Sequence, residues 1–212
     1  AQGDLAALMA RTAGADVVPI PWRAFGDNGL TAWTPGDLVT ERNTRAAPAP
    51  EPGVSKSKCL FRVASFAAAT DHAPRRPLVA APVVLNPDGA TLSNTALFQE
   101  RASRFRPHDV AAGARSAQIF HYAVRAREVF AMKADRGDGQ GKDGAKYRLG
   151  GRWHRIANRN DADAPQMAAQ LPRVRATLGG WRDDPEITRR EAVCRAWFTA
   201  RRAELGQIGA QA

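Results

Sequence analysis

The sequence has only two cysteines and no long apolar run. Cys59 and Cys194 lie 135 positions apart, in apolar surroundings and without the spacing of metal ligands. We therefore expect two buried free thiols in a reducing compartment. No stretch approaches the roughly 18 apolar residues that a membrane-spanning helix needs, and no basic leader with an apolar run opens the chain. These absences favour a soluble, cytoplasmic protein.

Lysine is also scarce, although the chain is strongly basic. Only five of the 31 basic residues are Lys, and the formal net charge is +10. Guanidinium groups match the oxygens of phosphates and carboxylates, so diphosphates, nucleic acid and acidic lipid headgroups are all candidate partners. An Ala- and Arg-rich genome would give the same charge, and composition leaves both explanations open.

The composition is otherwise that of a folded chain. Hydrophobic residues make up 44% of the 212 residues and charged residues 25%, which is too apolar for full disorder. The length permits one or two domains. Because the chain starts at Ala1 without an initiator Met, we expect that a piece of the parent protein is missing.

The order of apolar runs and breaking residues predicts an α/β protein. Asp4 can cap a first helix that Gly14 ends, and a tight loop is expected over residues 25–34, where Asn28 and the glycines permit positive φ. A turn is expected at Asn86-Pro-Asp-Gly89, and a helix that stops before Gly137. Strands are predicted at residues 17–22, 38–42, 58–66, 78–85 and 118–124, an extended surface connection at 46–53 and a loop at 101–114.

The last third of the sequence is predicted to be helical after a polar segment. Residues 135–151 are rich in Gly, Lys and Asp, and form either a substrate lid or a loop. Two helices follow, one over 167–178 with Asp163 as its cap and one from Pro185 to Gly206. Trp153, Trp181 and Trp197 are assigned to packing. We divide the chain into residues 1–134, 135–151 and 152–212.

Six short motifs follow one another along residues 4 to about 165. They are Trp22-Arg-Ala-Phe-Gly-Asp-Asn-Gly29, Leu38-Val-Thr-Glu-Arg42, Lys58-Cys-Leu-Phe-Arg62, His72-Ala-Pro74, Phe120-His121-Tyr122 with Arg125, Glu128, Phe130 and Lys133, and Asn158-Arg-Asn-Asp161 with Asp163. Each motif is weak alone. Their order resembles the downstream half of bacterial family-2-type glycosyltransferases that build surface polysaccharides.

The resemblance implies a fold, an activity and a cofactor. The family has a Rossmann-like α/β fold of the GT-A type, whose first half binds the nucleotide and ends with an Asp-x-Asp that holds Mn²⁺ or Mg²⁺ on the diphosphate. This chain looks like the acceptor half, because no such motif precedes Asp4. The Asp161 to Asp163 pair does not follow an apolar strand, and Asp163 is better explained as a cap. The implied activity is transfer of a sugar from a nucleotide-sugar to a glycan or other acceptor hydroxyl in the full-length parent. We expect this chain alone to be inactive.

Inverting transfer needs a carboxylate that deprotonates the acceptor hydroxyl. Glu41 is the first candidate, because it stands at the end of an expected strand beside Arg42, which would keep it ionised. Asp27 in the glycine loop is the second candidate. A surface ion pair between Glu41 and Arg42 explains the same residues without catalysis.

The remaining candidates concern the metal, the donor and the acceptor. The resemblance makes His121 a metal ligand, whereas a lone His in a strand is more often a core residue. Lys58 and Arg62 can face one side of a strand and neutralise the departing diphosphate, or they form a solvated basic edge. The residues expected at the acceptor are Trp22, Phe25, Gly26, Gly29 and Tyr122, although core packing is the commoner role of Trp.

A rival hypothesis is a basic binding module without catalysis. Its phosphate-tracking face would consist of Arg152, Arg155, Arg159, Arg173 and Arg175. No nucleic-acid motif supports it, and aromatic residues do not alternate with the basic ones as a stacking platform requires. We therefore expect no nucleic-acid partner, while the basic surface is compatible with peripheral association with an anionic membrane.

Overall fold

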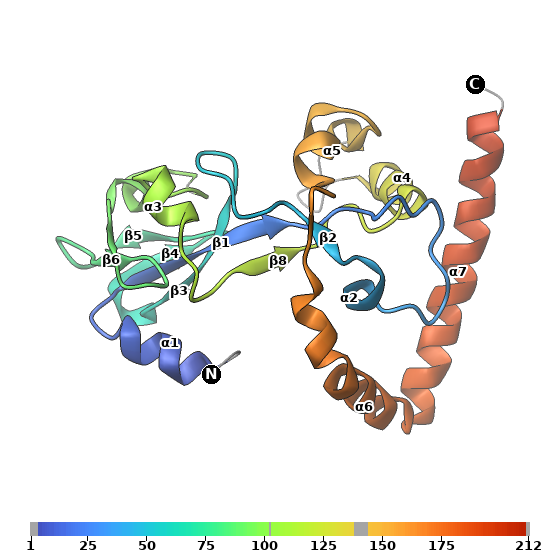
Figure 1. Cartoon of the computed structure of the whole chain (residues 1–212), viewed down its shortest axis with the longest axis horizontal. Coiled ribbons are helices and arrows are strands. Elements are labelled where there is room, and N and C mark those ends of the chain that lie inside the picture. Colours follow the sequence, from blue (N-terminus) through green and yellow to red (C-terminus); the bar gives the residue numbers. More distant parts are fainter. Residues whose placement is uncertain (1–3, 102, 138–143, 211–212) are drawn as a thin grey trace. The chain divides into compact units, whose positions relative to one another are not determined.

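The computed structural model describes residues 4–101, 103–137 and 144–210 (Figure 1). The chain forms two compact units. The first unit contains residues 1–24 and 47–121, and the second contains residues 25–46 and 122–212. Helices and strands occur in both units, and the larger sheet has parallel and antiparallel pairs. The α/β class predicted from the sequence is therefore confirmed at this coarse level.

The first unit contains most of the strands. Its elements are α1 (Leu5–Arg11), β1 (Val17–Ala24), β3 (Ser57–Phe61), β4 (Phe66–Ala69), β5 (Pro74–Pro77), β6 (Val84–Leu85), β7 (Thr91–Leu92), α3 (His108–Ala112) and β8 (Ile119–His121), with 3-10 helices at Val63–Ser65 and Thr95–Phe98. β1 pairs antiparallel with β3 and parallel with β6 and β8, and β6 pairs antiparallel with β7. β4 and β5 form a separate hairpin.

β1 is the central strand although it contains Pro19 and Pro21, which cannot donate backbone hydrogen bonds. Its pairing explains how they are accommodated. β6 pairs with β1 at Val17, and β8 pairs with it from Trp22 onward. Between these points the described partner of β1 is β3, with Pro19 opposite Cys59 and Pro21 opposite Ser57. Pro19 and Pro21 therefore lie in the part of β1 that, among the described strands, pairs only with β3.

A compact apolar core supports this sheet. Its residues are Val17, Phe66, Ala73, Val84, Leu92, Ala96, Leu97, Phe105 and Ala111. At its edge, the Asp16 carboxylate accepts hydrogen bonds from Ser65 Oγ (2.7 Å) and from the backbone N–H of Val83 (2.8 Å). These bonds hold the pKa of Asp16 below its usual value. Asp16 thus fixes the start of β1 to two distant segments.

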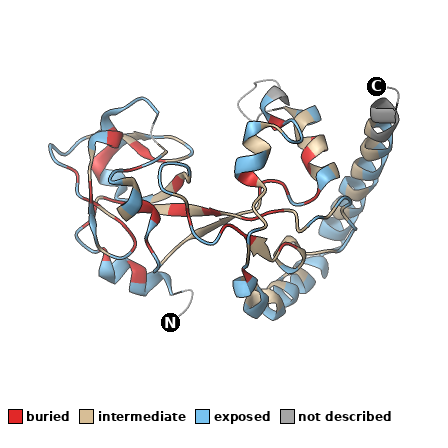
Figure 2. Ribbon diagram, turned by 45° about the horizontal axis from the view of Figure 1, so that its top comes forward, coloured by how far each residue is buried: buried red, intermediate tan, exposed pale blue. Residues whose placement is uncertain are grey.

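The second unit is mainly helical. Its elements are α2 (Val39–Arg42), β2 (Arg45–Ala46), α4 (Arg127–Arg136), α5 (Arg152–Ala157), β9 (Ala162–Asp163), α6 (Leu171–Arg182) and α7 (Pro185–Ala210), with 3-10 helices at Gly144–Tyr147 and Pro165–Gln170. β2 pairs antiparallel with β9. The core consists of Ala123, Val124, Phe130, Tyr147 and Ala157, with Trp153 packed against it. Figure 2 shows that α7, by contrast, is mostly exposed.

Several sequence predictions are confirmed. The Asp4 side chain accepts from the N–H groups of Ala6 and Ala7 and caps α1. Gly89 N–H donates to Asn86 O (2.9 Å) in the predicted turn, and α4 ends before Gly137. The long C-terminal helix begins at Pro185 as expected. These signals are local, and caps, turns and breakers act within a few residues.

Other predictions are wrong. Residues 39–42 form the helical turn α2 rather than a strand, so Glu41 does not stand at a strand end. Asp163 lies in β9 and caps no helix, and α7 continues past Gly206 to Ala210. The strand expected over 78–85 is reduced to β6, and the loop expected over 101–114 contains α3. Ala46, expected in a surface connection, is fully buried. Part of the lid or loop, residues 138–143, lies outside the described residues.

Three residues assigned to the interior lie at the surface. Trp181 is 59% exposed and Trp197 is 60% exposed, and Cys194 is exposed as well. α6 and α7 meet at their connection, α7 also contacts α4, and most described residues of α7 remain exposed. Trp153 does pack, because it stacks on Phe130. Helical periodicity identified α7, whereas the helix expected over 167–178 is divided into a 3-10 helix at Pro165–Gln170 and α6. Periodicity could not say whether another element covers each apolar stripe.

The two thiols are expected to differ sharply in reactivity. Burial raises the pKa of the Cys59 thiol to about 12, whereas Cys194 is exposed on α7. We expect Cys194 to react rapidly with a disulfide reagent in the native protein, and the half-buried Cys59, with its raised pKa, to react much more slowly until the protein unfolds. Cys194→Ser should remove the fast phase and Cys59→Ser should leave it. A fast phase that survives Cys194→Ser would contradict the packing of β3.

Candidate functional site

The first unit brings polar and aromatic side chains together around Trp22. We call this group, formed by Trp22, Lys58, Asp71, His72 and His121, the Trp22 cluster. The His121 ring stacks on the indole with centroids 3.8 Å apart and planes at 12°, and the His72 ring lies 5.1 Å from it. Lys58 Nζ is 5.7 Å from the indole centroid, within cation–π range. The pairing of β1 with β3 and with β8 sets this arrangement.

His72 is held in one tautomer. Its Nδ1 lies 2.8 Å from the Ser57 carbonyl oxygen, which can only accept, so Nδ1 carries the proton and Nε2 is left with its lone pair. Nε2 lies 3.5 Å from Asp71 Oδ2. Burial lowers the pKa of His72, against the opposing effects of the Ser57 bond and Asp71. His72 is therefore a neutral imidazole at neutral pH.

Lys58 and Arg62 do not act as a pair. Lys58 Nζ donates to the Asp71 carbonyl and lies 4.0 Å from its carboxylate. Arg62 follows the end of β3, and its guanidinium donates to the carbonyls of Ala13 and Ala15. Arg62 thus ties the α1–β1 connection to β3. The predicted diphosphate pair consequently has only Lys58 in the Trp22 cluster.

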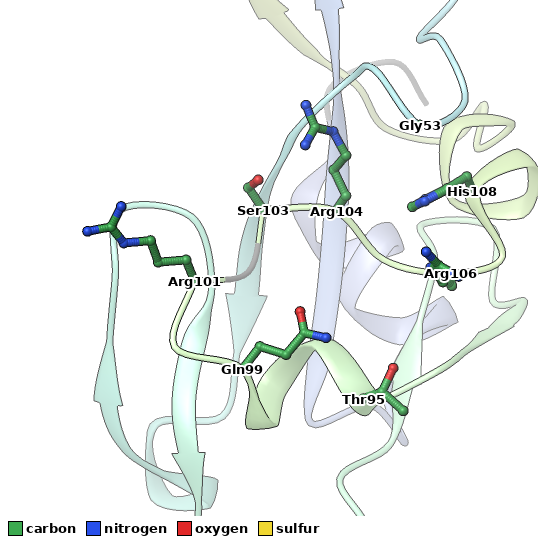
Figure 3. Close-up of a pocket in the computed structure, with 8 residues that line it drawn as sticks. All are labelled: Gly53, Thr95, Gln99, Arg101, Ser103, Arg104, Arg106 and His108. Carbon is green, nitrogen blue, oxygen red and sulfur yellow. The ribbon is translucent and has the colours of Figure 1, made fainter.

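The first unit also contains a basic cavity of about 460 Å³. Figure 3 shows Thr95, Gln99, Ser103, Arg104, Arg106 and His108 around its opening, with Gly53 behind, while Arg101 extends away from the others. None of the lining residues among the described part of the chain carries a carboxylate. The cavity therefore presents guanidinium, imidazole, hydroxyl and amide groups.

In the second unit, the glycine loop is held by two asparagines from residues 158–160. Asp27 Oδ2 accepts from Asn158 Nδ2 (2.9 Å), and Asp27 Oδ1 accepts from Asn160 Nδ2 (3.1 Å) and from Gly29 N (2.9 Å). In return, the amide oxygens of Asn158 and Asn160 accept from the N–H groups of Asp27 and Asn28. We call these five residues the glycine-loop clamp. With three donors on its oxygens, Asp27 serves as a structural acceptor.

Gly26 lies against this clamp. A Cβ at this position would be 2.1 Å from Asn160 Oδ1 and 2.5 Å from the Arg159 carbonyl oxygen. Asn28 and Gly29 have φ values of 54° and 74°, the left-handed region in which Asn and Gly are favoured. The predicted tight loop is therefore confirmed. Gly26 has no Cβ, which allows the backbone of Arg159 and the side chain of Asn160 to lie close to the loop.

Asn43 connects the glycine loop to the segment after β8. It is 3% exposed, and its Nδ2 donates to Gly26 O (2.9 Å) and to Arg125 O (2.7 Å). Beside it, the Phe25 ring contacts the Tyr122 ring with centroids 4.5 Å apart. Phe25 is fully buried, so its role here is packing. Of the predicted acceptor residues of this unit, Phe25, Gly26 and Gly29 therefore belong to an internally bonded loop, and Tyr122, which follows β8, packs on Phe25.

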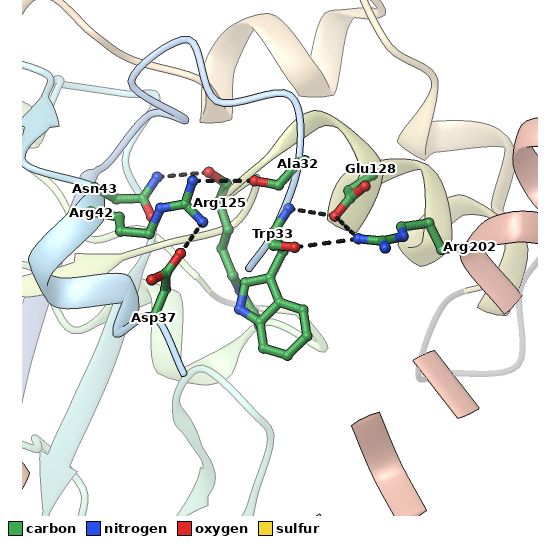
Figure 4. Close-up of polar contacts among 8 residues, drawn as sticks. All are labelled: Ala32, Trp33, Asp37, Arg42, Asn43, Arg125, Glu128 and Arg202. Carbon is green, nitrogen blue, oxygen red and sulfur yellow. Dashed lines mark hydrogen bonds and ion pairs between the residues drawn. The ribbon is translucent and has the colours of Figure 1, made fainter. Parts of the chain in front are cut away.

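Polar contacts around Trp33 attach α7 to α4 (Figure 4). Glu128 Oε1 accepts from the Trp33 N–H and lies 3.2 Å from Arg202 Nη1, which also donates to Trp33 O. Arg42 forms an ion pair with Asp37 at 2.5 Å and donates to Ala32 O. The Glu128 of the motif thus has a positioning role in the helical unit.

Glu41 lies on α2 and pairs with an unexpected partner. Its Oε1 accepts from Arg175 Nη2 at 2.6 Å, and both side chains are exposed. The predicted neighbour Arg42 binds Asp37 instead. Exposed pairs of this kind contribute little, about 0–1 kcal/mol. The contact favours the surface ion pair over the catalytic base, although with Arg175 in place of Arg42.

The described residues do not form a metal site. Within 4–101, 103–137 and 144–210, no three His, Cys, Asp or Glu side chains gather to hold an ion. His121, the predicted ligand, lies flat on the Trp22 ring instead. The described residues thus do not by themselves hold an ion, and the Mn²⁺ or Mg²⁺ expected in the full-length parent stays a prediction.

Comparison with protein-family models, with curated proteins and with solved structures found no match. In the described part of the chain, no helix combines the length and the apolar character needed to cross a membrane. The family resemblance thus stays a hypothesis based on motif order.

Sequence reasoning missed some residues of these clusters. Asp71 and Asn43 carry no motif of their own, and they are placed by pairing between distant segments. His72 had a signal, since it opens His72-Ala-Pro74, but nothing local places it beside Trp22. Arg104, Arg106 and His108 alternate along the sequence, and this spacing could have indicated one basic face.

Proposed function

We propose that this chain is the acceptor-side part of a family-2-type glycosyltransferase with a GT-A-like fold. The enzyme would move a sugar from a nucleotide-sugar to an acceptor hydroxyl. One observation supports it most: Trp22, Lys58, His72 and His121 come from four different motifs, separated by up to 99 positions, and meet in one cluster.

The second unit supports the same proposal independently. The sixth motif and the downstream part of the fifth meet there around the glycine loop, through Asn158, Asn160 and Arg125, and Asn43, which follows the second motif, joins Gly26 to Arg125. Most of these contacts are polar and do not arise from simple apolar burial. Motifs that were recognised only by their order in the sequence are thus physically connected.

The Trp22 cluster has groups suited to an acceptor hydroxyl. His72 Nε2 is the best proton acceptor there, because the imidazole is neutral and the Ser57 carbonyl fixes its orientation. A proton taken up by Nε2 would gain the Asp71 carboxylate as partner. The buried Trp22 Nε1–H has no hydrogen-bond acceptor among the described residues. We therefore assign His72 the role first given to Glu41 and Asp27.

The stacking role expected of Trp22 takes a different form. His121 covers one indole face, so an open platform for a sugar ring is not what this residue offers. The indole edge, Lys58 and His72 remain as the polar contacts. The proposed acceptor is held mainly by hydrogen bonds and less by stacking.

The contacts give less support to the rival basic module. Arg159 binds Asp161 at 2.6 Å, Arg175 binds Glu41 at 2.6 Å, and Arg155 donates to the Gly150 carbonyl. Guanidinium groups engaged in this way are not lined up for a phosphate backbone. The prediction that nucleic acid is not the partner stays a prediction, which salt-dependent binding can test.

Saturation-transfer NMR with a panel of methyl glycosides tests the proposal on the whole chain. We expect saturation transfer to at least one glycoside, with affinity reduced about tenfold or more by Trp22→Ala and by His72→Ala. Trp181→Ala is the matched control, because this tryptophan is exposed in the other unit. Its affinity should equal that of the wild type.

Two results would overturn the proposal. One is the absence of saturation transfer to any glycoside. The other is equal weakening by Trp22→Ala and Trp181→Ala, which would place binding outside the Trp22 cluster. Tight binding to random duplex DNA, falling steeply with salt, would support the basic module instead.

A further inference from the structure

We propose that the basic cavity of the first unit binds a phosphate-bearing small molecule through Arg104, Arg106 and His108. This site is separate from the Trp22 cluster and does not depend on the proposed sugar transfer. Its groups are donors or cations, which is the chemistry that recognises phosphate or diphosphate oxygens.

The two arginines flank a buried aromatic residue in the segment that precedes α3. Phe105 lies between them, is 1% exposed and belongs to the apolar core. Phe105 packs in the core, and the side chains of its two neighbours, Arg104 and Arg106, lie at the surface. Both are exposed at the cavity. The apolar anchor therefore determines where the charges lie.

Backbone bonds fix this segment at both ends. Ser103 O accepts from the Ser57 N–H (2.8 Å), and Arg106 O accepts from the Ser93 N–H (2.8 Å). Ser57 also accepts from His72 through its carbonyl, so the same buried residue supports the Trp22 cluster. The cavity wall is therefore held in place before any ligand binds, which lowers the entropic cost of binding.

The donors are oriented as well as charged. Arg104 Nε donates to the Val54 carbonyl (3.2 Å), which leaves its two terminal NH₂ groups for a ligand. His108 Nδ1 lies 3.0 Å from the Phe105 carbonyl oxygen, so this nitrogen carries a proton, and Nε2 donates to a phosphate oxygen only when the imidazole is protonated. Thr95, Gln99 and Ser103 add neutral hydrogen-bonding groups around the opening (Figure 3).

Shape selects a small ligand over a polymer. A cavity of about 460 Å³ falls in the range of small-molecule sites and exceeds the volume that a phosphate alone fills. The charges of Arg104, Arg106 and His108 come from one short segment and line one wall of the hollow, whereas a nucleic-acid surface needs a row of cations that follows the backbone. We therefore assign the site to a phosphate monoester or diphosphate with a small organic part.

Titration calorimetry with inorganic pyrophosphate and inorganic phosphate tests this site on the whole chain. We expect pyrophosphate to bind more tightly than phosphate, and the Arg104→Gln/Arg106→Gln variant to bind pyrophosphate at least about tenfold more weakly. The control is Arg76→Gln/Arg115→Gln, which removes the same charge from two exposed arginines of the same unit. The control should retain the wild-type affinity within about twofold.

The outcomes separate this site from its alternatives. Equal weakening in both double variants would mean diffuse attraction only and would overturn the proposal. Binding of single-stranded DNA without binding of pyrophosphate would also overturn it. Binding of pyrophosphate that moves the His108 ring signals in NMR would support it. Glycoside binding at Trp22 should be unchanged in Arg104→Gln/Arg106→Gln, so the two proposals fail independently.

Discussion

Gly26→Ala is expected to lower the free energy of unfolding of the second unit by about 3 kcal/mol or more. The new Cβ would meet Asn160 Oδ1 at 2.1 Å and the Arg159 carbonyl at 2.5 Å. A side-chain amide can move away, but the Arg159 backbone cannot without pulling Asn158 and Asn160 from Asp27. Hydrogen exchange followed by mass spectrometry would measure the loss segment by segment.

Gly180→Ala provides the matched control in the same unit. This glycine lies within α6, and an added Cβ meets nothing within 4 Å. We expect a gain of about 0.5–1 kcal/mol, because Ala is favoured over Gly inside a helix. Gly26→Ala combined with Asn160→Ala should cost less than the sum of the two, since the first clash disappears. Full additivity would show that Asn160 does not lie against Gly26.

Phe130→Ala is expected to lower the free energy of unfolding by about 3–5 kcal/mol. Phe130 is fully buried, stacks on Trp153 with centroids 5.8 Å apart and meets the edge of Tyr147 at 6.1 Å. Removal of the ring leaves a cavity between α4 and α5 that these aromatics cannot fill. Urea unfolding followed by tryptophan fluorescence would measure the change.

Phe130→Leu is the control for this packing. It keeps much of the apolar volume and loses the ring contacts, so we expect a cost of about 1–1.5 kcal/mol. Hydrogen exchange near Tyr147 should increase strongly in Phe130→Ala and little in Phe130→Leu. A loss below about 1 kcal/mol in Phe130→Ala would show that residues 147–157 do not pack on α4.

These two positions differ in how visible they are in the sequence. Phe130 stands in a helix predicted to stop before Gly137, so α4 was predictable, whereas the packing of Phe130 on Trp153 and Tyr147 was not. The sequence showed that Gly26 belongs to a tight loop. It did not show that Asn160, 134 positions away, lies so close to Gly26 that a Cβ has no room there. Local sequence patterns predict the shape of the backbone, but they do not say which distant residue will pack against it.

The candidate site shows the same division. Motif order identified Trp22, Lys58 and His121 as candidates, and the structure places them together. It also shows that Arg62 binds carbonyls near α1 and that Glu41 binds Arg175. Charge and spacing could not distinguish these uses, because an ion pair forms with whichever opposite charge the fold brings near.

By itself the sequence determined the α/β class, the caps and ends of several helices, the glycine loop and the turn at Asn86, since these depend on residues within about one helical turn. Only the tertiary structure decided that residues 39–42 form a helix, that Trp181 and Trp197 are exposed, and that Asp71, His72 and Trp22 meet. These features depend on which distant segments pair with β1 or cover a helix face, and such pairings are fixed by the free energy of the whole fold rather than by local preference.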